Sequence, residues 1–170
     1  MLNYFHLFSL PESYQVDATA LSQAYQRLQN QYHPDRHVGK PAEEQHRTLL
    51  MASEVNRGWK VLRSPVERAG HLLEIHTGQV ETSGVVLAAA FLLEQIDWRE
   101  QLEAAASESA LLQIQQSTLQ RLAEEGEKFA AALQRQEWTE ARLYHAYMQF
   151  FQRLCEESLA RLERLDEEKQ

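Results

Sequence analysis

Residues 17–41, DATALSQAYQRLQNQYHPDRHVGKP, decide the architecture of the first half of the chain. Asp17 is a favourable N-cap residue, and the apolar side chains that follow it recur at the spacing of one helical face. Pro34 disfavours helical backbone at the residue before it, so the helix ends near Tyr32. The stretch therefore predicts an amphipathic helix followed by a loop over residues 33–41.

The tripeptide His33-Pro34-Asp35 is the strongest chemical signal in this loop. Pro34 stiffens the bend, and the imidazole and the carboxylate beside it then project from an exposed loop, which suits recognition of a partner. Arg27 adds a basic group on the exposed side of the preceding helix. The alternative is a plain helix-stop turn in which Asp35 bonds only its own backbone.

More helices surround this hairpin in the first half of the chain. A second helix is expected over 42–63, and Ser64-Pro65-Val66-Glu67 closes it and opens another, because Ser caps, Pro suits the first helical position and Glu completes a capping box. That helix should end near His76, before Gly78. Tyr4, Phe5, Leu7 and Phe8 predict a short N-terminal helix that ends at Pro11.

The composition excludes a large sheet. Leu, Ala, Glu and Gln supply 83 residues and Val, Ile and Thr only 17, and the first group favours helices whereas the second favours strands. All four prolines lie in the first 65 residues. Long amphipathic helices are therefore expected over 84–105, 108–135 and 137–168, with short joins that make sequence neighbours antiparallel.

The predicted fold class is all-α, with an N-terminal helical hairpin and a C-terminal antiparallel three-helix bundle. The predicted boundaries are 1–76 for the first domain, 77–83 for a linker and 84–170 for the bundle.

The net charge of −8 lies entirely in the second half, where 17 acidic residues face 9 basic ones after position 76. Such a surface does not suit nucleic acid, whose phosphates require positive charge. The longest apolar run, Val85–Leu93, is too short to cross a bilayer, and the N-terminus lacks the pattern of a signal peptide. Cys155 is the single cysteine, which fits a reducing compartment. We expect a cytoplasmic protein without a membrane or nucleic-acid partner.

The helix expected over 84–105 has two apolar faces. One face suffices for a bundle seam, and it contains Leu87, Phe91, Trp98 and Leu102. The second has an apolar middle and an acidic edge, formed by Leu92, Leu93, Ile96, Asp97 and Glu100. Unpaired carboxylates are rarely buried, so this second face resembles a partner site. The alternative is a helix buried on both sides.

No catalytic site is apparent in the sequence. His33 and His37 have a ligand-like spacing, but Pro34 breaks the helix that would bring them to one face. Residues 124–127, with three glutamates around Gly126, are expected to form a solvated face. Neither a glycine-rich phosphate loop nor a nucleophile elbow occurs. We expect a protein that is not an enzyme and that needs no cofactor.

The arrangement resembles the J-domain, and more closely one branch of J-proteins, the HscB family of iron–sulfur cluster co-chaperones. The J-domain resemblance rests on Tyr4-Phe-x-Leu-Phe, Leu10-Pro11, Tyr25-x-x-Leu28 and Gln31-Tyr-His-Pro-Asp35. The resemblance to the HscB branch rests on Arg68-Ala69-x-x-Leu72-Leu73 and on Phe91-Leu-Leu-Glu-Gln-Ile-Asp-Trp-Arg-Glu100. It covers the whole chain in order.

The resemblance implies two contact surfaces and two partners. The first surface would meet the DnaK-type ATPase chaperone HscA and stimulate its ATP hydrolysis, and it comprises Arg27, His33, Pro34 and Asp35. The second would bind the cluster scaffold protein IscU, and it comprises Leu92, Leu93, Ile96, Asp97, Glu100 and, on the last helix, Phe150. Any cluster would be carried by the scaffold.

Two departures and two rival functions accompany the resemblance. The family often has an acidic residue where this chain has Ala104, and the helix before the tripeptide has Gln29, Asn30 and Gln31 where J-domains are often lysine-rich. One rival is a general J-domain co-chaperone for unfolded clients, which would be expected to carry a Gly/Phe-rich linker or a Cys-rich zinc module. The other, a helical metalloenzyme, would need Glu-x-x-His pairs that residues 84–170 lack.

Overall fold

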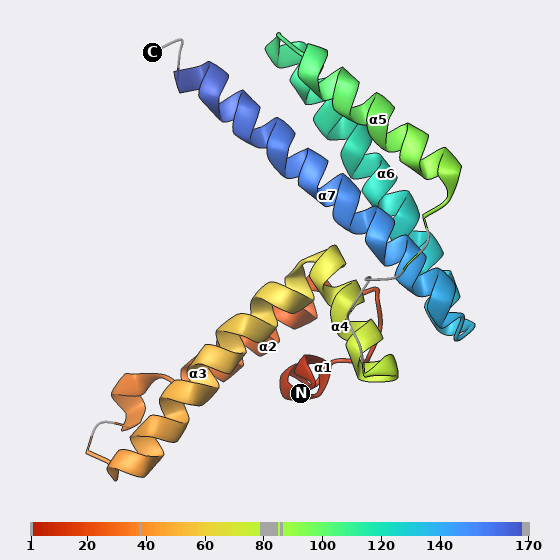
Figure 1. Ribbon diagram of the computed structural model, residues 1–170. Helices are drawn as coiled ribbons and strands as arrows, with labels where there is room; N and C mark the ends of the chain where they lie inside the picture. The colour runs from red at the N-terminus through yellow and green to blue at the C-terminus, as the bar shows by residue number, and fades with distance from the viewer. Residues whose placement is uncertain (1, 38, 79–84, 86, 168–170) are drawn as a thin grey trace. The chain divides into compact units, whose positions relative to one another are not determined.

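The computed structural model describes residues 2–37, 39–78, 85 and 87–167. It divides into two compact units, Met1–Val80 and Glu81–Gln170. All secondary structure in the described residues is helical, and the predicted fold class, a J-type hairpin followed by a helical bundle, is confirmed (Figure 1). Residues 79–83 of the predicted linker lie outside the described residues.

The described residues of the first unit form four α-helices and one 3₁₀-helix. In chain order they are α1 (Tyr4–Phe8), α2 (Ala18–Gln31), the 3₁₀-helix η1 (Pro34–His37), α3 (Ala42–Arg63) and α4 (Pro65–Thr77). The sequence predicted an irregular loop over 33–41, and this was wrong for residues 34–37. A tight 3₁₀ turn forms there, since the Arg36 N–H donates to the His33 carbonyl at 3.1 Å.

Local caps set the helix boundaries that the sequence predicted in this unit. The Asp17 carboxylate accepts hydrogen bonds from the first-turn N–H groups of Thr19 and Ala20 at 2.8 and 3.2 Å. The Ser64 hydroxyl accepts from the Glu67 N–H at 3.3 Å. After α4 the backbone turns at Gly78, whose φ of 71° is left-handed and suits glycine.

Helices α2 and α3 form the hairpin. Leu21, Ala24 and Leu28 of α2 are buried. The Tyr25 ring stacks on Trp59 of α3 with centroids 4.5 Å apart, and its hydroxyl donates to the Asn56 Oδ1 at 2.8 Å. The polar turn at η1 joins the far ends of these two helices (Figure 1).

Helix α1 packs directly on the backbone of α3. A Cβ atom built at Gly58 of α3 would lie 2.8 Å from carbon atoms of both the Phe8 and the Tyr4 rings. Real Cβ atoms do not approach other atoms so closely, so the absence of a side chain at this position makes room for α1.

A buried histidine of α4, His71, holds α1 in place. The His71 Nε2 accepts the Tyr4 backbone N–H at 3.1 Å, and its ring stacks on Phe5 with centroids 5.9 Å apart. Burial lowers the pKa of His71 below its ordinary value. The Tyr4 hydroxyl donates to the Glu54 Oε2 at 2.9 Å, and burial together with this bond raises the pKa of Tyr4 to about 12.

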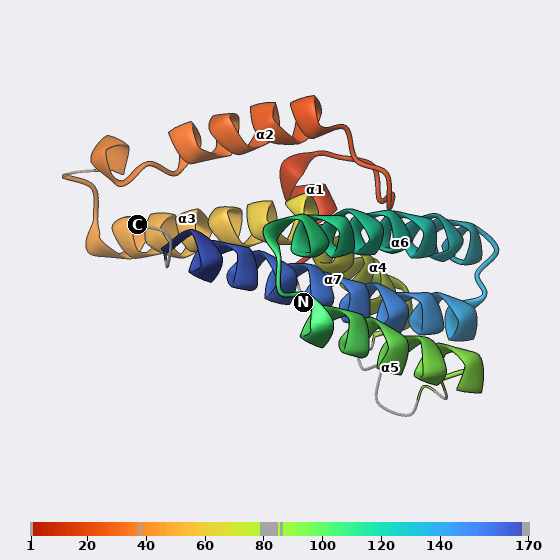
Figure 2. The same ribbon diagram turned by 90° about the horizontal axis from the view of Figure 1, so that it is seen from above.

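The second unit is a bundle of three helices, α5 (Ala89–Ala104), α6 (Glu108–Gln134) and α7 (Trp138–Glu167), which run alongside one another (Figure 1, Figure 2). Helix α5 begins five residues later than the expected position 84. Its N-cap, Ala88, has no side chain that can accept a hydrogen bond, and β-branched Val85 favours extended backbone. None of the described helices is long and apolar enough to cross a membrane.

The core of this unit joins α5 to α7 through aromatic rings. Phe91 stacks on Tyr147 with centroids 3.7 Å apart, and Trp98 meets Phe151 edge-on at 6.0 Å. The buried members of the core are Phe91, Leu102, Leu111, Ile114, Tyr147, Phe150, Phe151, Leu154 and Leu162. The predicted seam residue Leu87 packs against this core from outside the helix.

One arginine connects all three helices. The Arg121 guanidinium of α6 donates from Nε and Nη2 to the two carboxylate oxygens of Glu94 on α5 at 3.1 and 3.2 Å. It lies 5.1 Å from the centroid of the Phe151 ring of α7. A planar guanidinium suits such a position because it can pair with a carboxylate in its plane and stack on a ring with its face.

Glu124 and Glu127 are exposed, as the sequence predicted for residues 124–127, but Glu125 is buried. The Glu125 side chain is only 1% exposed, with Arg121 at 3.2 Å and Lys128 at 2.8 Å. A buried carboxylate needs compensating charge, and these two cations provide it from the same helix.

Candidate functional site

The His33–Asp35 turn stands at the solvent-exposed end of the hairpin. The Asp35 side chain is 85% exposed, and its carboxylate lies 3.7 Å from the His33 Nδ1. That nitrogen also accepts the Asp35 backbone N–H at 3.3 Å. The turn is therefore held by its own atoms, while the carboxylate remains open to a partner.

Arg27, the fourth residue predicted for this surface, is exposed on α2. Arg36 and Lys40, next to the turn, are also exposed, and Lys40 forms an ion pair with Glu44. Exposed basic side chains therefore lie on the helix before the turn and in the turn itself, together with the exposed Asp35 carboxylate.

The second predicted surface lies on α5. Leu92, Leu93 and Ile96 are 46%, 64% and 54% exposed, and they form an apolar patch that the bundle core leaves uncovered. Asp97 and Glu100 are exposed on the following turn. These five side chains come from one helix, so the structure brings them together.

Phe150 does not join this exposed group. It is only 7% exposed and meets Phe91 edge-on with centroids 5.6 Å apart. The resemblance assigned Phe150 to the scaffold-binding surface. The structure instead places Phe150 in the core, where it packs against Phe91. Its contact with Phe91 helps to hold α5 on the bundle core.

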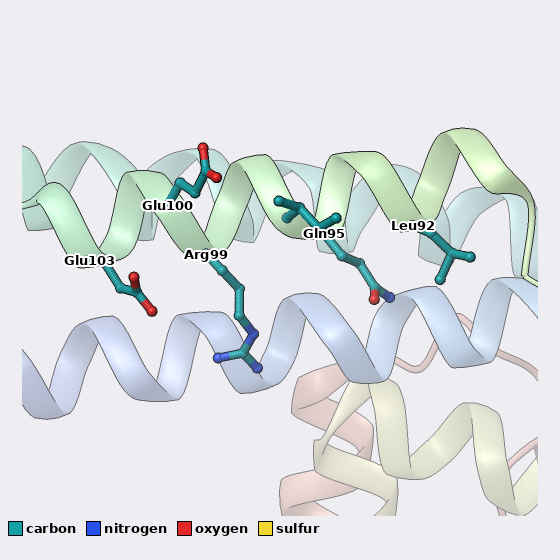
Figure 3. Close-up of a pocket in the computed structure, with 6 residues that line it drawn as sticks. Leu92, Gln95, Arg99, Glu100 and Glu103 are labelled. Carbon is teal, nitrogen blue, oxygen red and sulfur yellow. The ribbon is translucent and has the colours of Figure 1, made fainter.

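A shallow groove of about 380 Å³ follows this part of α5 (Figure 3). Its lining consists of Leu92, Gln95, Ile96, Arg99, Glu100 and Glu103. Gln95, Arg99 and Glu103 were not predicted from the sequence. Their signal was present, because they lie three, seven and eleven residues after Leu92 and so share its side of the helix.

Arg99 and Arg161 hold the end of α5 that carries this groove against α7. The Arg99 Nη1 donates to the Glu157 Oε2 of α7 at 3.3 Å. The Arg161 Nη1 donates at 2.6 Å to the carbonyl of Leu102, one of the last carbonyls of α5, and its Nη2 donates to Glu157 at 3.2 Å. The C-terminal end of α5 is thereby tied to α7.

The described residues offer little for covalent or metal chemistry. They contain no group of three or more His, Cys, Asp or Glu side chains placed to hold a metal ion. Burial raises the pKa of the Cys155 thiol, which disfavours the reactive thiolate.

A helical hairpin that carries a His-Pro-Asp turn, joined to a helical bundle with an uncovered apolar surface, is the architecture of a J-domain co-chaperone. Comparison with known proteins agrees. A family model described as the HSCB C-terminal oligomerisation domain matches residues 87–158.

Two relatives carry the description co-chaperone protein HscB homolog. The one from Mannheimia succiniciproducens is 31% identical over 92% of this chain and 94% of its own length. The one from Azoarcus sp. is 36% identical over 67% of this chain, a match that spans 65% of the relative. The crystal structure of human co-chaperone protein HscB superposes with a TM-score of 0.87 at 26% identity, over 95% of this chain and 82% of the human one. The chain belongs to the HscB family of co-chaperones.

Proposed function

We propose that this chain stimulates ATP hydrolysis by the DnaK-type chaperone HscA and delivers the scaffold protein IscU to it, which assists the maturation of iron–sulfur proteins in the cytoplasm. The observation that carries the proposal is the presence of two separate exposed surfaces, one polar and one apolar, on two compact units of one chain.

The turn is the proposed contact with the chaperone. His33, Pro34 and Asp35, with Arg27, present a carboxylate and basic groups at a position that the backbone fixes. A pre-organised turn loses little conformational entropy on binding, so its few polar contacts can be specific.

The α5 patch is the proposed contact with the scaffold. Leu92, Leu93 and Ile96 supply an apolar centre, and Asp97 and Glu100 supply a charged rim, which is the usual anatomy of a protein interface. Phe150 contributes through its packing against Phe91.

Tethering explains how the two contacts work together. When one chain binds both partners, the scaffold is held close to the chaperone at a high effective concentration, and ATP hydrolysis can then trap it. The chain itself carries out no covalent step in this scheme.

The test measures ATP hydrolysis by purified HscA with this chain, with IscU and with both. Each addition is expected to raise the rate, and both together should raise it by more than the sum of the two. A reduced, unfolded protein in place of IscU should not produce this synergy. If it does, the general J-domain co-chaperone is the correct function.

A further inference from the structure

We propose that the outer face of α6 is a self-association surface, on which α6 of a second copy of this chain packs antiparallel to form a two-fold symmetric dimer. The face is formed by four exposed side chains, Leu112, Gln116, Leu119 and Ala123. It is separate from the turn and from the α5 patch, so the association requires neither partner of the proposed function.

The contact between α6 and α5 shows which way this face points. The Arg121 guanidinium donates to Glu94 of α5, so Arg121 marks the side of α6 that meets α5. Leu119 and Leu112 lie two and nine residues before Arg121, and at about 100° per residue they point about 160–180° away from it. Both leucines are about half exposed, at 49% and 47%. They therefore lie on the side of α6 that faces away from α5.

Helix α7 extends this face. Glu157 and Arg161 mark the side of α7 that meets α5, because Glu157 accepts a hydrogen bond from Arg99 and Arg161 donates to the Leu102 carbonyl. Leu159 lies two residues from each of them, so its side chain points to the opposite side. It is 45% exposed. Both helices of the pair thus present leucine on the side away from α5.

The exposed leucines of the two helices lie at one level. The Arg121 guanidinium lies 5.1 Å from the centroid of the Phe151 ring, and α6 and α7 run antiparallel because a short turn joins them. Leu159, eight residues after Phe151, is therefore level with the residue eight positions before Arg121, which is the neighbour of Leu112. The exposed leucines of this face consequently form one apolar patch.

The distribution of charge favours a second copy as the occupant of this patch. Residues 109–120 of α6 contain no charged side chain, although the chain has a net charge of −8. A second copy carries the same negative charge, so it can approach closely only where charge is absent, whereas a basic partner would be attracted to the acidic parts of the surface. The family model that matches residues 87–158, which include this face, is described as an oligomerisation domain.

The order of side chains along α6 fits a two-fold axis. Leu112, Gln116, Leu119 and Ala123 follow one another at intervals of four, three and four residues, which is the same spacing in both directions. With the axis between Gln116 and Leu119, an antiparallel mate places its Ala123 opposite Leu112 and its Leu119 opposite Gln116. The small alanine leaves room for the leucine, so the face is complementary to itself.

The size of the face limits the strength of the association. The stripe from Leu112 to Ala123 is about 16 Å long. Two such faces would bury on the order of 1,000 Å², which is the low end for a specific protein interface, so the dimer should dissociate on dilution. Each copy would keep its α5 surface free, because that surface lies on the other side of the bundle.

Sedimentation equilibrium of the full chain, from about 5 μM to about 500 μM, tests the proposal. The unsubstituted chain should pass from monomer to dimer over this range, whereas Leu119→Glu should associate at least about tenfold more weakly. The matched control is Leu93→Glu, which places the same charge on a more exposed leucine of α5, at 64%, and should associate as the unsubstituted chain does. A monomer at every concentration would overturn the proposal, as would a dimer that Leu119→Glu leaves intact.

A cross-link tests the register of the two α6 helices. In a chain that carries Cys155→Ser, which removes the single cysteine, Gln116→Cys places a thiol about 10 Å from its mate across the two-fold axis. A short bismaleimide should join these two thiols. Gln134→Cys, at another exposed glutamine of α6, is the matched control, because its mate would lie about 50 Å away. Equal cross-linking of the two variants, or none for Gln116→Cys, would overturn the proposed packing.

Discussion

The turn at residues 33–37 and the outer surface of α5 are both exposed, but they are built in opposite ways. The turn is held by its own backbone and by the contact between His33 and Asp35. The α5 surface depends on remote contacts, because the core residues Phe91 and Leu102 and the Arg161 hydrogen bond hold the helix that carries Leu92. The exposed residues of the turn do not contribute to the core, whereas on α5 exposed and core residues alternate along the helix.

The largest expected effect is in the turn. Asp35→Asn should reduce stimulation of HscA to the basal rate, because it removes the exposed charge while the fold is unaffected; substitutions at such exposed sites usually change stability by ~0.5 kcal/mol or less. A steady-state ATPase assay and a thermal melt measure the two properties. Glu43→Gln, another exposed carboxylate in the same unit, should retain full stimulation. Full stimulation by Asp35→Asn would remove the turn from the mechanism.

The second-largest expected effect distinguishes the exposed side of α5 from the side that packs in the core. Replacing Leu92, Leu93 and Ile96 together with Ala should weaken IscU binding by about 100-fold, since apolar anchors at the centre of an interface are often worth ~2 kcal/mol or more. The melting temperature should change little because the three side chains are exposed.

The matched control for that experiment is Phe91→Ala, which should cost about 3–5 kcal/mol of unfolding free energy because the ring is in the core. Urea unfolding beside calorimetry separates the two results. An early-melting triple variant, or one with normal affinity, would show that the α5 surface is not a partner site.

A smaller effect tests how α5 is anchored. Arg121→Met should lower the stability of the second unit by about 1–3 kcal/mol, since it leaves buried Glu125 with one cation and Glu94 without its bidentate partner. Urea unfolding monitored by circular dichroism measures this loss. Arg153→Met, at an exposed position of α7, should be nearly neutral. An unchanged urea midpoint for Arg121→Met would mean that the contacts of Arg121 do not stabilise the second unit.

The smallest effect concerns the core of the unit that carries the turn. Because burial lowers the pKa of His71, the unfolded chain binds a proton more readily than the folded one. The stability that neutral His71 contributes is complete above its ordinary pKa of 6.5 and is lost as the pH falls. Glu74 and Glu12 oppose this shift, but burial is the larger cause.

One proton limits this pH dependence to about 1.4 kcal/mol per pH unit. The test compares urea midpoints at about pH 7.5 and about pH 5.5 for the unsubstituted chain and for His71→Gln, whose amide oxygen can still accept the Tyr4 N–H. The variant should lose less stability in acid. Equal losses would assign the pH dependence to other groups.

Sequence was most informative where structure is set locally. The caps at Asp17, Ser64 and Gly78 use atoms within a few residues, so the boundaries of α2 and α4 could be predicted. Helix α5 begins at Ala89, and its N-cap, Ala88, has no side chain that can cap the helix, so no local signal marks this boundary. Because the sequence fits a helical pattern from position 84 onward, the prediction placed the start of α5 too close to the N-terminus.

The residues of the candidate site also divide into those that the local sequence could predict and those that it could not. The helical wheel correctly left Leu92, Leu93 and Ile96 outside the core. The spacing of Arg99 and Glu103 from Leu92 could have indicated that they share its side of α5, but the pairing of Arg99 with Glu157, which lies 58 residues away in the sequence, could not be predicted. Phe150 was assigned by resemblance, and its burial could be known only from its three-dimensional neighbours. The burial of Glu125 had a local signal, since cations lie four residues before it and three after it.

Gly58 has a consequence for anyone who engineers this chain for higher stability. A glycine in the middle of a 22-residue helix is the first position that a helix-propensity scale would change, for a gain of about 1 kcal/mol as alanine. The added methyl group would lie 2.8 Å from the Tyr4 and Phe8 rings and would push α1 away from α3. A design procedure that scores helices one at a time would therefore select a substitution that removes the N-terminal segment from its docking place.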